Sequence, residues 1–432
     1  MNRAAESHSP GQVHFVWTRA IDGVPMAGRP NVARQVRSAF LSQGYAISES
    51  IIQPLSGSQG AGRLIEAGFR LLGGLLTGRP LPLQCLLFGA KREASRVLAE
   101  LPPGCELVYL DGVRCLRVLE QLRHLRPDLA IVTDLDDLMS RRMDLLLRLD
   151  QPPSMGYLAG AMPAAVGRLL AMPILARLLL RYEAASLRQA ERAIAEHSDC
   201  VVLISSADAA VLRGRVPSAD VRSISVAATR PVSARRAMQP PYRFVFIGTD
   251  ALRQNQLTID ALIALWRKRR VKTPLVIYGE QHRAYDLPPM VTMPGYADCL
   301  DQVHDGHSVL LTPSYVAGGI KTKVIEAFAY GTPVAGNAVT FEAIAIGPDY
   351  PLLFETEEHL AALLDAPERF AEVFASAIDH GLAIVDEYHD PARINAAWAK
   401  VAQSAVRRHG QKRGGVAADY APGALAAEGK RS

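Results

Sequence analysis

Short apolar runs alternate with helical patterns along most of the chain. In the first half, the runs that we interpret as buried strands cover residues 13–17, 106–110, 129–133 and 200–204. Helical patterns lie between them, and residues 164–196 predict either one long helix or two shorter ones. Strands that alternate with helices are typical of βαβ units, so this half predicts a parallel sheet covered by helices.

A segment rich in proline, serine and arginine, residues 227–241, interrupts this pattern. After it, apolar runs predict strands at residues 244–247, 275–278, 308–311 and 333–335, and helices at 258–268 and 321–330. We therefore predict an α/β protein with two doubly wound, Rossmann-like halves. The predicted units are a first domain over 12–227, a linker over 228–241, a second domain over 242–408 and a disordered tail over 410–432.

The composition is that of an ordinary globular protein. Of the 432 residues, 49% are hydrophobic and 21% are charged, which excludes disorder for most of the chain. The five cysteines show no CxxC pair and no Cys/His spacing typical of zinc, so we expect mostly buried free thiols in a reducing compartment. The net charge of +5 fits an anionic substrate or an anionic membrane surface, and it does not indicate nucleic-acid binding.

The sequence offers one amphipathic segment but no membrane span. The first residues are polar, and no apolar run reaches roughly 18 residues without a charge, so we expect neither a signal peptide nor a spanning helix. Residues 63–76 place Arg63, Glu66 and Arg70 on one helical face and apolar residues on the other. A core helix packed on a sheet is the favoured interpretation, and a helix lying on a membrane surface is the alternative. The expected location is the cytoplasm, with a peripheral contact at the inner face of the membrane as the alternative.

The segment 310–341 carries the clearest chemistry. It reads LLTPSYVAGGIKTKVIEAFAYGTPVAGNAVTF, which predicts a strand, a loop, a helix, a glycine stop and another strand. Gly318 and Gly319 let the backbone approach a ligand, and the free N–H groups of the following helical turn favour an anion. Lys321 and Lys323 add positive charge, and Glu326 lies one turn further, where its carboxylate suits ribose hydroxyls. The pattern predicts a nucleoside-diphosphate site, and a surface helix with an ordinary Lys/Glu pair is the alternative.

The stretch GIKTKVIEAFAYGTPV resembles the donor-binding motif of the family 4 (group 1) glycosyltransferases of GT-B fold, in a bacterial exopolysaccharide-type subgroup. In that family the glutamate matched by Glu326 binds the ribose, and the basic residue and amides before it hold the diphosphate. Residues 243–262 resemble the first strand–loop–helix of the family's donor domain, which adds Gly248 and Arg253 to the donor-binding candidates. The resemblance extends over roughly residues 12–400 and is strongest over 243–341, and it implies two domains facing a central cleft.

Two positions depart from the family's pattern. The family often has two glutamates eight residues apart, the first contacting the transferred sugar, and Gly318 stands at that first position. The basic pair that follows the first donor-domain strand is also missing, because Thr249 and Gln254 lie near those positions and Arg253 is the nearby cation. These departures leave the donor geometry open and keep an inactive homologue among the alternatives.

Acidic and glycine residues of the first half are further candidates. Asp134, Asp136 and Asp137 follow a predicted strand, where they can orient an acceptor hydroxyl or act as a base. The alternatives are a solvated helix cap and a DxD metal site, of which the metal role is not expected in a GT-B frame. Gly23 and Gly28 lie in a loop that can bring backbone amides to the donor or acceptor, or is a plain loop. For His304 and His307 we expect surface positions without a metal.

We conclude that the sequence predicts a hexosyltransferase-type glycosyltransferase. It would move a sugar from a nucleoside-diphosphate donor to a glycan or lipid-linked acceptor, with Lys323, Asp134 and Asp136 as catalytic candidates. The resemblance implies retention of configuration, no obligatory metal, no cofactor beside the sugar-nucleotide substrate, and a role in bacterial surface polysaccharide synthesis. A sugar-nucleotide epimerase of GT-B fold and a catalytically silent partner protein remain as alternatives.

Overall fold

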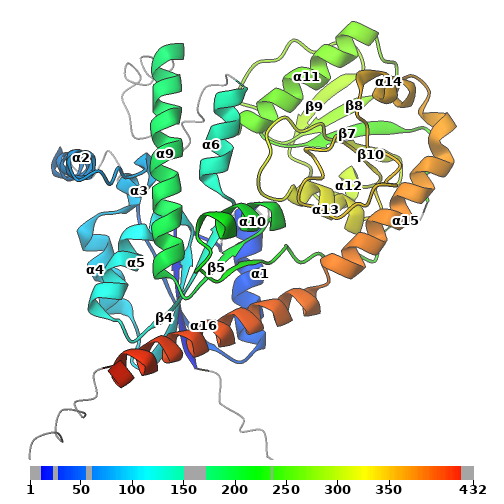
Figure 1. Cartoon of the computed structure of the whole chain (residues 1–432). Coiled ribbons are helices and arrows are strands. Elements are labelled where there is room, and N and C mark those ends of the chain that lie inside the picture. Colours follow the sequence, from blue (N-terminus) through cyan, green and yellow to red (C-terminus); the bar gives the residue numbers. More distant parts are fainter. Residues whose placement is uncertain (1–10, 23–27, 55–60, 150–171, 235–236, 420–432) are drawn as a thin grey trace, which may run out of the picture.

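Two parallel β-sheets, each flanked by helices, form the chain (Figure 1). The computed structural model describes residues 11–22, 28–54, 61–149, 172–234 and 237–419. The first sheet has six strands in the order β2 (Ala46–Ile51), β1 (Gln12–Trp17), β3 (Cys105–Asp111), β4 (Ala130–Asp136), β5 (Cys200–Leu203) and β6 (Val221–Ser223). The second has five in the order β11 (Val334–Ala335), β10 (Ser308–Leu311), β7 (Arg243–Ile247), β8 (Leu275–Tyr278) and β9 (Val291–Gly295). The predicted α/β fold with two parallel sheets is confirmed.

Helices fill the crossovers between the strands. Those of the first domain are α1 (Arg29–Ser42), α2 (Ala61–Leu76), α3 (Leu83–Phe88), α4 (Lys91–Glu100), α5 (Leu116–Leu125), α6 (Met139–Arg148), α9 (Pro173–His197) and α10 (Ser206–Arg215). Those after the linker are α11 (Arg253–Arg269), α12 (Leu300–Val303), α13 (Thr322–Ala329), α14 (Glu357–Asp365), α15 (Ala371–Tyr388) and α16 (Pro391–Asp419). Among the helices in these described ranges, none is long and apolar enough to cross a membrane.

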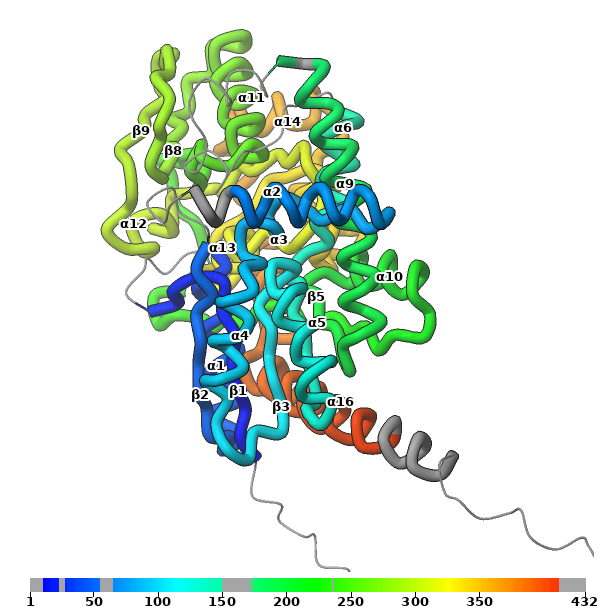
Figure 2. The backbone as a smooth tube through the Cα atoms, turned by 90° about the vertical axis from the view of Figure 1, so that its left-hand side faces the viewer, coloured from blue at the N-terminus to red at the C-terminus, as the bar shows by residue number. Residues whose placement is uncertain are grey.

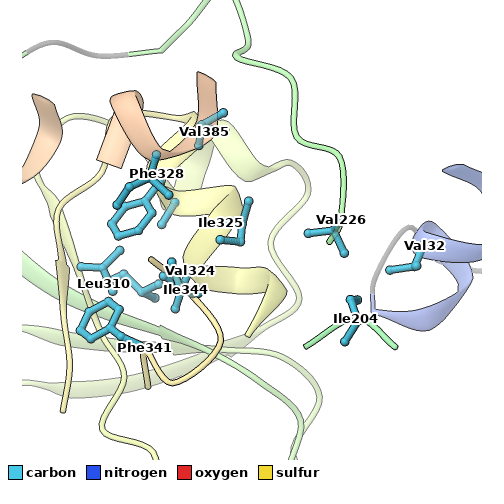
Figure 3. Packing of buried hydrophobic residues seen from close by; sticks show 14 of the residues in the cluster. Val32, Ile204, Val226, Leu310, Val324, Ile325, Phe328, Phe341, Ile344 and Val385 are labelled. Atoms are coloured by element: carbon cyan, nitrogen blue, oxygen red, sulfur yellow. The ribbon is translucent and has the colours of Figure 1, made fainter. Parts of the chain in front are cut away.

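The central strands form because their apolar runs are covered on both faces. Every residue of β5 and β10 is buried, and β1, β3 and β4 are buried over almost their whole length. Such unbroken apolar runs are typical of strands in helix-covered parallel sheets. The same contacts fix α13, whose Val324, Ile325 and Phe328 pack against Leu310 and Phe341 (Figure 3). At roughly 1.5–3 kcal/mol for each fully buried side chain, this packing holds the N-terminus of α13 in place.

The last helix returns to the first sheet, which differs from the predicted division. α16 follows α15 and packs against α1 and β4 beneath the first sheet (Figure 1). Its Trp398 ring lies 6.2 Å from the Phe40 ring and 6.0 Å from the Tyr109 ring. Residues 391–408, which we placed in the second domain, therefore contact the first. α16 also continues to Asp419, so residues 410–419 of the predicted tail are helical, while 420–432 lie outside the described residues.

The amphipathic segment lies on the surface, so the core-helix interpretation is wrong. α2 runs along the outside of the first domain beside α3 (Figure 2). Its apolar side chains are exposed, among them Phe69 at 70% and Leu76 at 79%. Its charged face is turned inward instead, where Glu66 accepts a hydrogen bond from the Lys91 amide and Arg70 lies against Gly89. Glu66 and Arg70 line a cavity of about 690 Å³ between α2 and the body of the domain.

Candidate functional site

A cleft of about 640 Å³ lies between the two domains. The carboxyl ends of parallel strands meet at one edge of a sheet, and ligands of doubly wound folds bind there. The first domain contributes residues at strand ends, in loops and on the first turns of helices, including Gly28, Arg29, Asp111, Asp136, Asp137 and Arg142. The second contributes residues at the starts of α11 and α13, including Arg253, Gly318, Gly319, Lys321 and Lys323. The cleft thus brings the predicted motif of the second domain opposite the predicted acidic turn of the first.

The loop before α13 has the backbone form that the glycines permit. Gly318 and Gly319 have φ angles of 106° and 62°, in the region that L residues rarely adopt. The Lys321 side chain folds back over this loop and donates to the Gly318 carbonyl at 3.1 Å and to the Val316 carbonyl at 3.4 Å. The loop is therefore shaped so that its backbone faces the cleft.

Burial shifts the titration of the motif's charged side chains. Burial lowers the pKa of Lys323 to about 7, with Lys321 lowering it further and Glu326 opposing. Burial likewise lowers the pKa of Lys321 to about 8. The Lys323 ammonium lies 4.1 Å from the centre of the Phe246 ring and 3.4 Å from Asn255 Oδ1. An anion in the cleft would favour the charged forms of both lysines and raise their pKa.

The other donor-binding candidates differ in how they meet the cleft. Burial raises the pKa of Glu326 to about 7, and the charge of Lys323 opposes this rise. Glu326 lies one turn into α13, outside the cleft lining. Gly248 is also outside the cleft lining. A Cβ at this position would lie 2.8 Å from Asn255 Nδ2, so a glycine is needed here for close packing. Arg253 is the first residue of α11, lines the cleft and donates to Gln256 Oε1 at 2.8 Å.

An arginine organises the acidic residues of the first domain. Arg29, at the start of α1, forms ion pairs with Asp111 at 2.7 Å, Asp134 at 2.8 Å and Asp136 at 3.2 Å. The Tyr109 hydroxyl donates to Asp134 at 2.6 Å. Burial makes the pKa of Asp134 higher than usual. Burial also acts to raise the pKa of Asp111, but the charges of Arg29 and Arg19 and the hydrogen bonds from Arg29 and Thr18 together lower it. The guanidinium and its partners form one network, which we call the Arg29 network.

Of the two predicted catalytic aspartates, only Asp136 reaches the cleft. Asp134 is buried beneath Arg29 and Tyr109 and does not line it. Asp136 has a φ of 65°, and its side chain is 36% exposed and held by Arg29 on one oxygen. The chain therefore presents the Asp136 carboxylate to the cleft. Asp134 lies behind it, and its Oδ1 accepts a hydrogen bond from the Asp136 amide at 2.9 Å.

A second group of charges joins the domains at the rim of the cleft. Arg141 of α6 pairs with Asp208 of α10 at 2.8 Å and also with Glu342, which follows β11 in the second domain. Arg142 pairs with Asp137. Of these ion pairs, the one between Arg141 and Glu342 links α6 directly to the second domain.

Sequence reasoning located part of this site. Gly28 lines the cleft with a φ of 57°, as the loop hypothesis allows, and Gly23 lies outside the described residues. The residues that we missed include Arg29, Asp111, Asp208 and Glu342. One sequence signal was available for Asp111, because an aspartate stands near the end of two strands, Asp111 in β3 and Asp134 in β4. In the structure, the strand register pairs these two residues.

The histidine and metal expectations can be compared with the structure. His304 is buried, with Nδ1 3.1 Å from the Thr332 hydroxyl, so its expected surface position is wrong. Across the described ranges, no group of three or more His, Cys, Asp or Glu side chains is placed to hold a metal ion. All five cysteines are free thiols, and all but Cys299 are buried.

Residues 241–379 match the family model of the glycosyl transferases group 1. The matched segment runs from the start of the second sheet into α15 and contains the predicted donor motif. No curated protein sequence matches the chain significantly. The second domain is therefore a glycosyltransferase group 1 domain, and it identifies the chain as an enzyme of the glycosyltransferase class.

Solved structures share the whole architecture at low sequence identity. Sucrose-phosphate synthase from Thermosynechococcus elongatus superposes with a TM-score of 0.60 at 16% identity, over 91% of this chain and 98% of that one. HepE from Anabaena, solved with UDP-glucose, superposes with a TM-score of 0.56 at 13% identity, over 91% and 100%. TarM gives a TM-score of 0.55 at 9% identity, over 90% and 98%. These likenesses show that the fold is GT-B.

Proposed function

We propose that this protein transfers a sugar from a nucleoside-diphosphate donor to a hydroxyl of a glycan or lipid-linked acceptor. The observation that supports this most is the cleft itself, in which Lys321, Lys323 and the Gly318–Gly319 backbone face Asp136 on the opposite wall. One wall suits a leaving diphosphate and the other suits an attacking hydroxyl. We place the protein in family 4, in its bacterial exopolysaccharide-type subgroup, with retention of configuration and a role in surface polysaccharide synthesis.

The second domain supplies the donor side of the reaction. When the sugar–phosphate bond breaks, negative charge gathers on the diphosphate, and preorganised cations lower that barrier. Lys323 and Lys321 are desolvated and held by the fold before any ligand arrives, and a bound diphosphate would favour their charged forms. Glu326 would position the ribose. UDP is the first nucleotide to test, because HepE was solved with UDP-glucose.

The first domain supplies the acceptor side. Arg29 holds one Asp136 oxygen and leaves the carboxylate partly exposed to the cleft, which suits a hydrogen bond from an acceptor hydroxyl. Asp134 acts as a positioning residue behind it, through the Asp136 amide and Arg29. Gly28 brings the first turn of α1 to the same wall.

The outer surface of α2 supports a peripheral membrane contact at the cytoplasmic face. Its row of exposed apolar side chains comprises Ile65, Phe69, Leu72, Leu75 and Leu76. Exposed cations lie nearby, with Arg79 in the loop after α2 and Lys91 and Arg92 at the start of α4, and Arg79 and Lys91 line the same cavity as Ile65 and Phe69. An apolar helix face bordered by cations is typical of helices that lie in the surface of an anionic bilayer, where a lipid-linked acceptor would be presented.

The test is a thermal-shift titration of the protein with UDP, GDP, CDP and ADP. A bound nucleotide at about 100 times its Kd stabilises the folded state by about 2.7 kcal/mol. We expect one nucleotide to raise the Tm of the wild type and of Glu357→Ala, a variant of a surface ion pair in the same domain, but not of Glu326→Ala. If no nucleotide raises the Tm of the wild type, the proposed donor site is wrong.

The same preparation separates the alternatives. With the stabilising nucleotide's sugar donors, a transferase consumes donor in an acceptor-dependent way and gives a product of one anomeric configuration. A sugar-nucleotide epimerase changes the donor without acceptor. A silent partner protein binds the nucleotide and changes nothing, and that result would contradict the transferase proposal.

A further inference from the structure

Carboxylates occupy the two backbone amides that face the cleft at the start of α13. The Gly318 amide donates to Glu342 Oε2 at 3.1 Å. The Gly319 amide donates to Asp208 Oδ2 at 3.2 Å, across the domain boundary. Both glycines have positive φ angles, and the loop turns the Gly318 N–H toward Glu342 of its own domain and the Gly319 N–H toward Asp208 of the other domain. In the unliganded chain, negatively charged oxygens therefore already stand at this backbone.

The same two carboxylates are bound by an arginine of the first domain. One terminal nitrogen of Arg141 donates to Asp208 Oδ1 at 2.8 Å. The other terminal nitrogen pairs with Glu342. Its neighbour Arg142 pairs with Asp137 and lies beside the loop, since a Cβ on Gly319 would come within 3.9 Å of an Arg142 nitrogen. Lys321 covers the loop from its own side. The amides thus lie among cations of both domains.

The charges of this group balance without a ligand. Arg141, Arg142 and Lys321 are its cations, and Asp137, Asp208 and Glu342 are its anions. A diphosphate that entered beside all of these carboxylates would be repelled. A diphosphate that replaced a carboxylate would find two amides and guanidinium groups already positioned, and arginine binds phosphate oxygens well through its paired N–H groups.

We propose that the donor's diphosphate exchanges with these carboxylates and takes Arg141 and Arg142 of the first domain as its cationic ligands. This inference rests on the proposed function and names the cations of the same site. It accounts for the missing basic pair near Thr249 and Gln254, because Arg141 and Arg142 of α6 add their charge to that of Lys321 and Lys323 in the second domain. The domains close on the diphosphate because its ligands come from both of them.

The two carboxylates differ in how they leave. Glu342 is 25% exposed at its side chain and lies on a loop of the second domain, so it can turn toward solvent. Asp208 is fully buried and is held by Arg141 and by the Leu138 amide at 3.3 Å, so it stays with the first domain. Opening of the cleft would part Asp208 from the Gly319 amide, since these groups belong to different domains. Glu342 is therefore the competing group that a substitution can remove.

The experiment measures the affinity of inorganic pyrophosphate and of the best-binding nucleoside diphosphate by calorimetry. The variants are Arg142→Gln and Glu342→Gln. Arg188→Gln is the matched control, because Arg188 of α9 pairs with Asp144 of α6, the helix that carries Arg142, and lies outside the cleft lining. We expect Arg142→Gln to weaken both ligands about tenfold and Glu342→Gln to strengthen them about threefold to tenfold. The control should match the wild type.

The opposite signs of the two effects decide the outcome. If Glu342→Gln weakens binding or leaves it unchanged, the carboxylate does not compete with the diphosphate and the inference is overturned. If Arg142→Gln binds pyrophosphate as the wild type does, the arginine is no ligand and the inference is equally overturned. Both results are distinct from a failure of the proposed function, in which the wild type binds no nucleoside diphosphate at all.

Discussion

Substitution of Arg29 should destabilise the first domain more than any surface charge does. The Arg29 side chain is 7% exposed, and Asp111 and Asp134 are each 3% exposed. Arg29→Met would leave two buried carboxylates without their cation. Loss of one partner of a buried ion pair costs roughly 3–5 kcal/mol, because the remaining charge stays desolvated.

The size of the effect follows from the size of the domain. For a unit of roughly 150–250 residues, each kcal/mol shifts Tm by about 2–4 °C. The expected loss is therefore roughly 6–20 °C, measured by differential scanning fluorimetry at pH 7. The matched control is Arg37→Met on the same helix, whose partner Asp22 is 64% exposed, and it should change stability by less than about 1 kcal/mol.

The pH dependence provides an independent check. In Arg29→Met the folded state disfavours ionised Asp111 and Asp134, so their folded pKa values rise above the unfolded ones. Proton binding then stabilises the folded variant, and the Tm deficit relative to wild type should shrink as pH falls from 7 toward 4. Neutralising one acid in the double variant Arg29→Met/Asp134→Asn should also recover part of the loss. An Arg29→Met protein that melts with the wild type at pH 7 would refute the stabilising role of the network.

Three further predictions concern the site, a buried histidine and α2. Lys323→Met should weaken nucleoside-diphosphate binding about tenfold or more without lowering Tm. Because the bound phosphate favours the ammonium, wild-type affinity should fall as pH rises above about 7, the pKa of Lys323, and calorimetry in buffers of different ionisation enthalpy measures the proton uptake. Burial lowers the pKa of His304 to about 4 from 6.5, so the unfolded state binds the proton first and the free energy of unfolding should fall by about 3 kcal/mol between pH 6.5 and 4. Chemical denaturation should show that His304→Gln reduces this pH dependence. Phe69→Ser should abolish flotation with vesicles containing anionic lipid while leaving Tm unchanged. Leu125→Ser, at a leucine of α5 that is 57% exposed, should float as the wild type does.

The elements that the sequence predicted well are those with a local cause. The strands buried on both faces contain continuous apolar runs, and α13 is marked by its glycines, its lysines and its apolar face. β2 was missed because it is an edge strand with the polar sequence AISESI, which shows no buried run. α2 shows the limit of periodicity, since an amphipathic pattern gives two faces but does not say which one faces the protein.

The site follows the same division. The Gly318–Lys323 backbone was predictable because its residues are adjacent in sequence. The Arg29 network was not, because its members lie on α1, β3 and β4, and only the strand register places Asp111 next to Asp134. The position of α16 on the first sheet likewise depends on tertiary contacts of Trp398 that no local pattern contains.

The two departures from the family's motif acquire a different meaning in three dimensions. Gly318 lacks the carboxylate that the resemblance leads one to expect, but without a ligand Glu342 brings a carboxylate to the Gly318 amide from the loop after β11. The basic pair near Thr249 is missing, but Arg142 lies beside Gly319 from the opposite domain. Each missing charge has a counterpart that is remote in sequence and adjacent in space. Absence of the motif residues is therefore a weak argument for a silent partner protein, because a motif compares positions along the chain whereas a phosphate meets whichever groups the fold places around it.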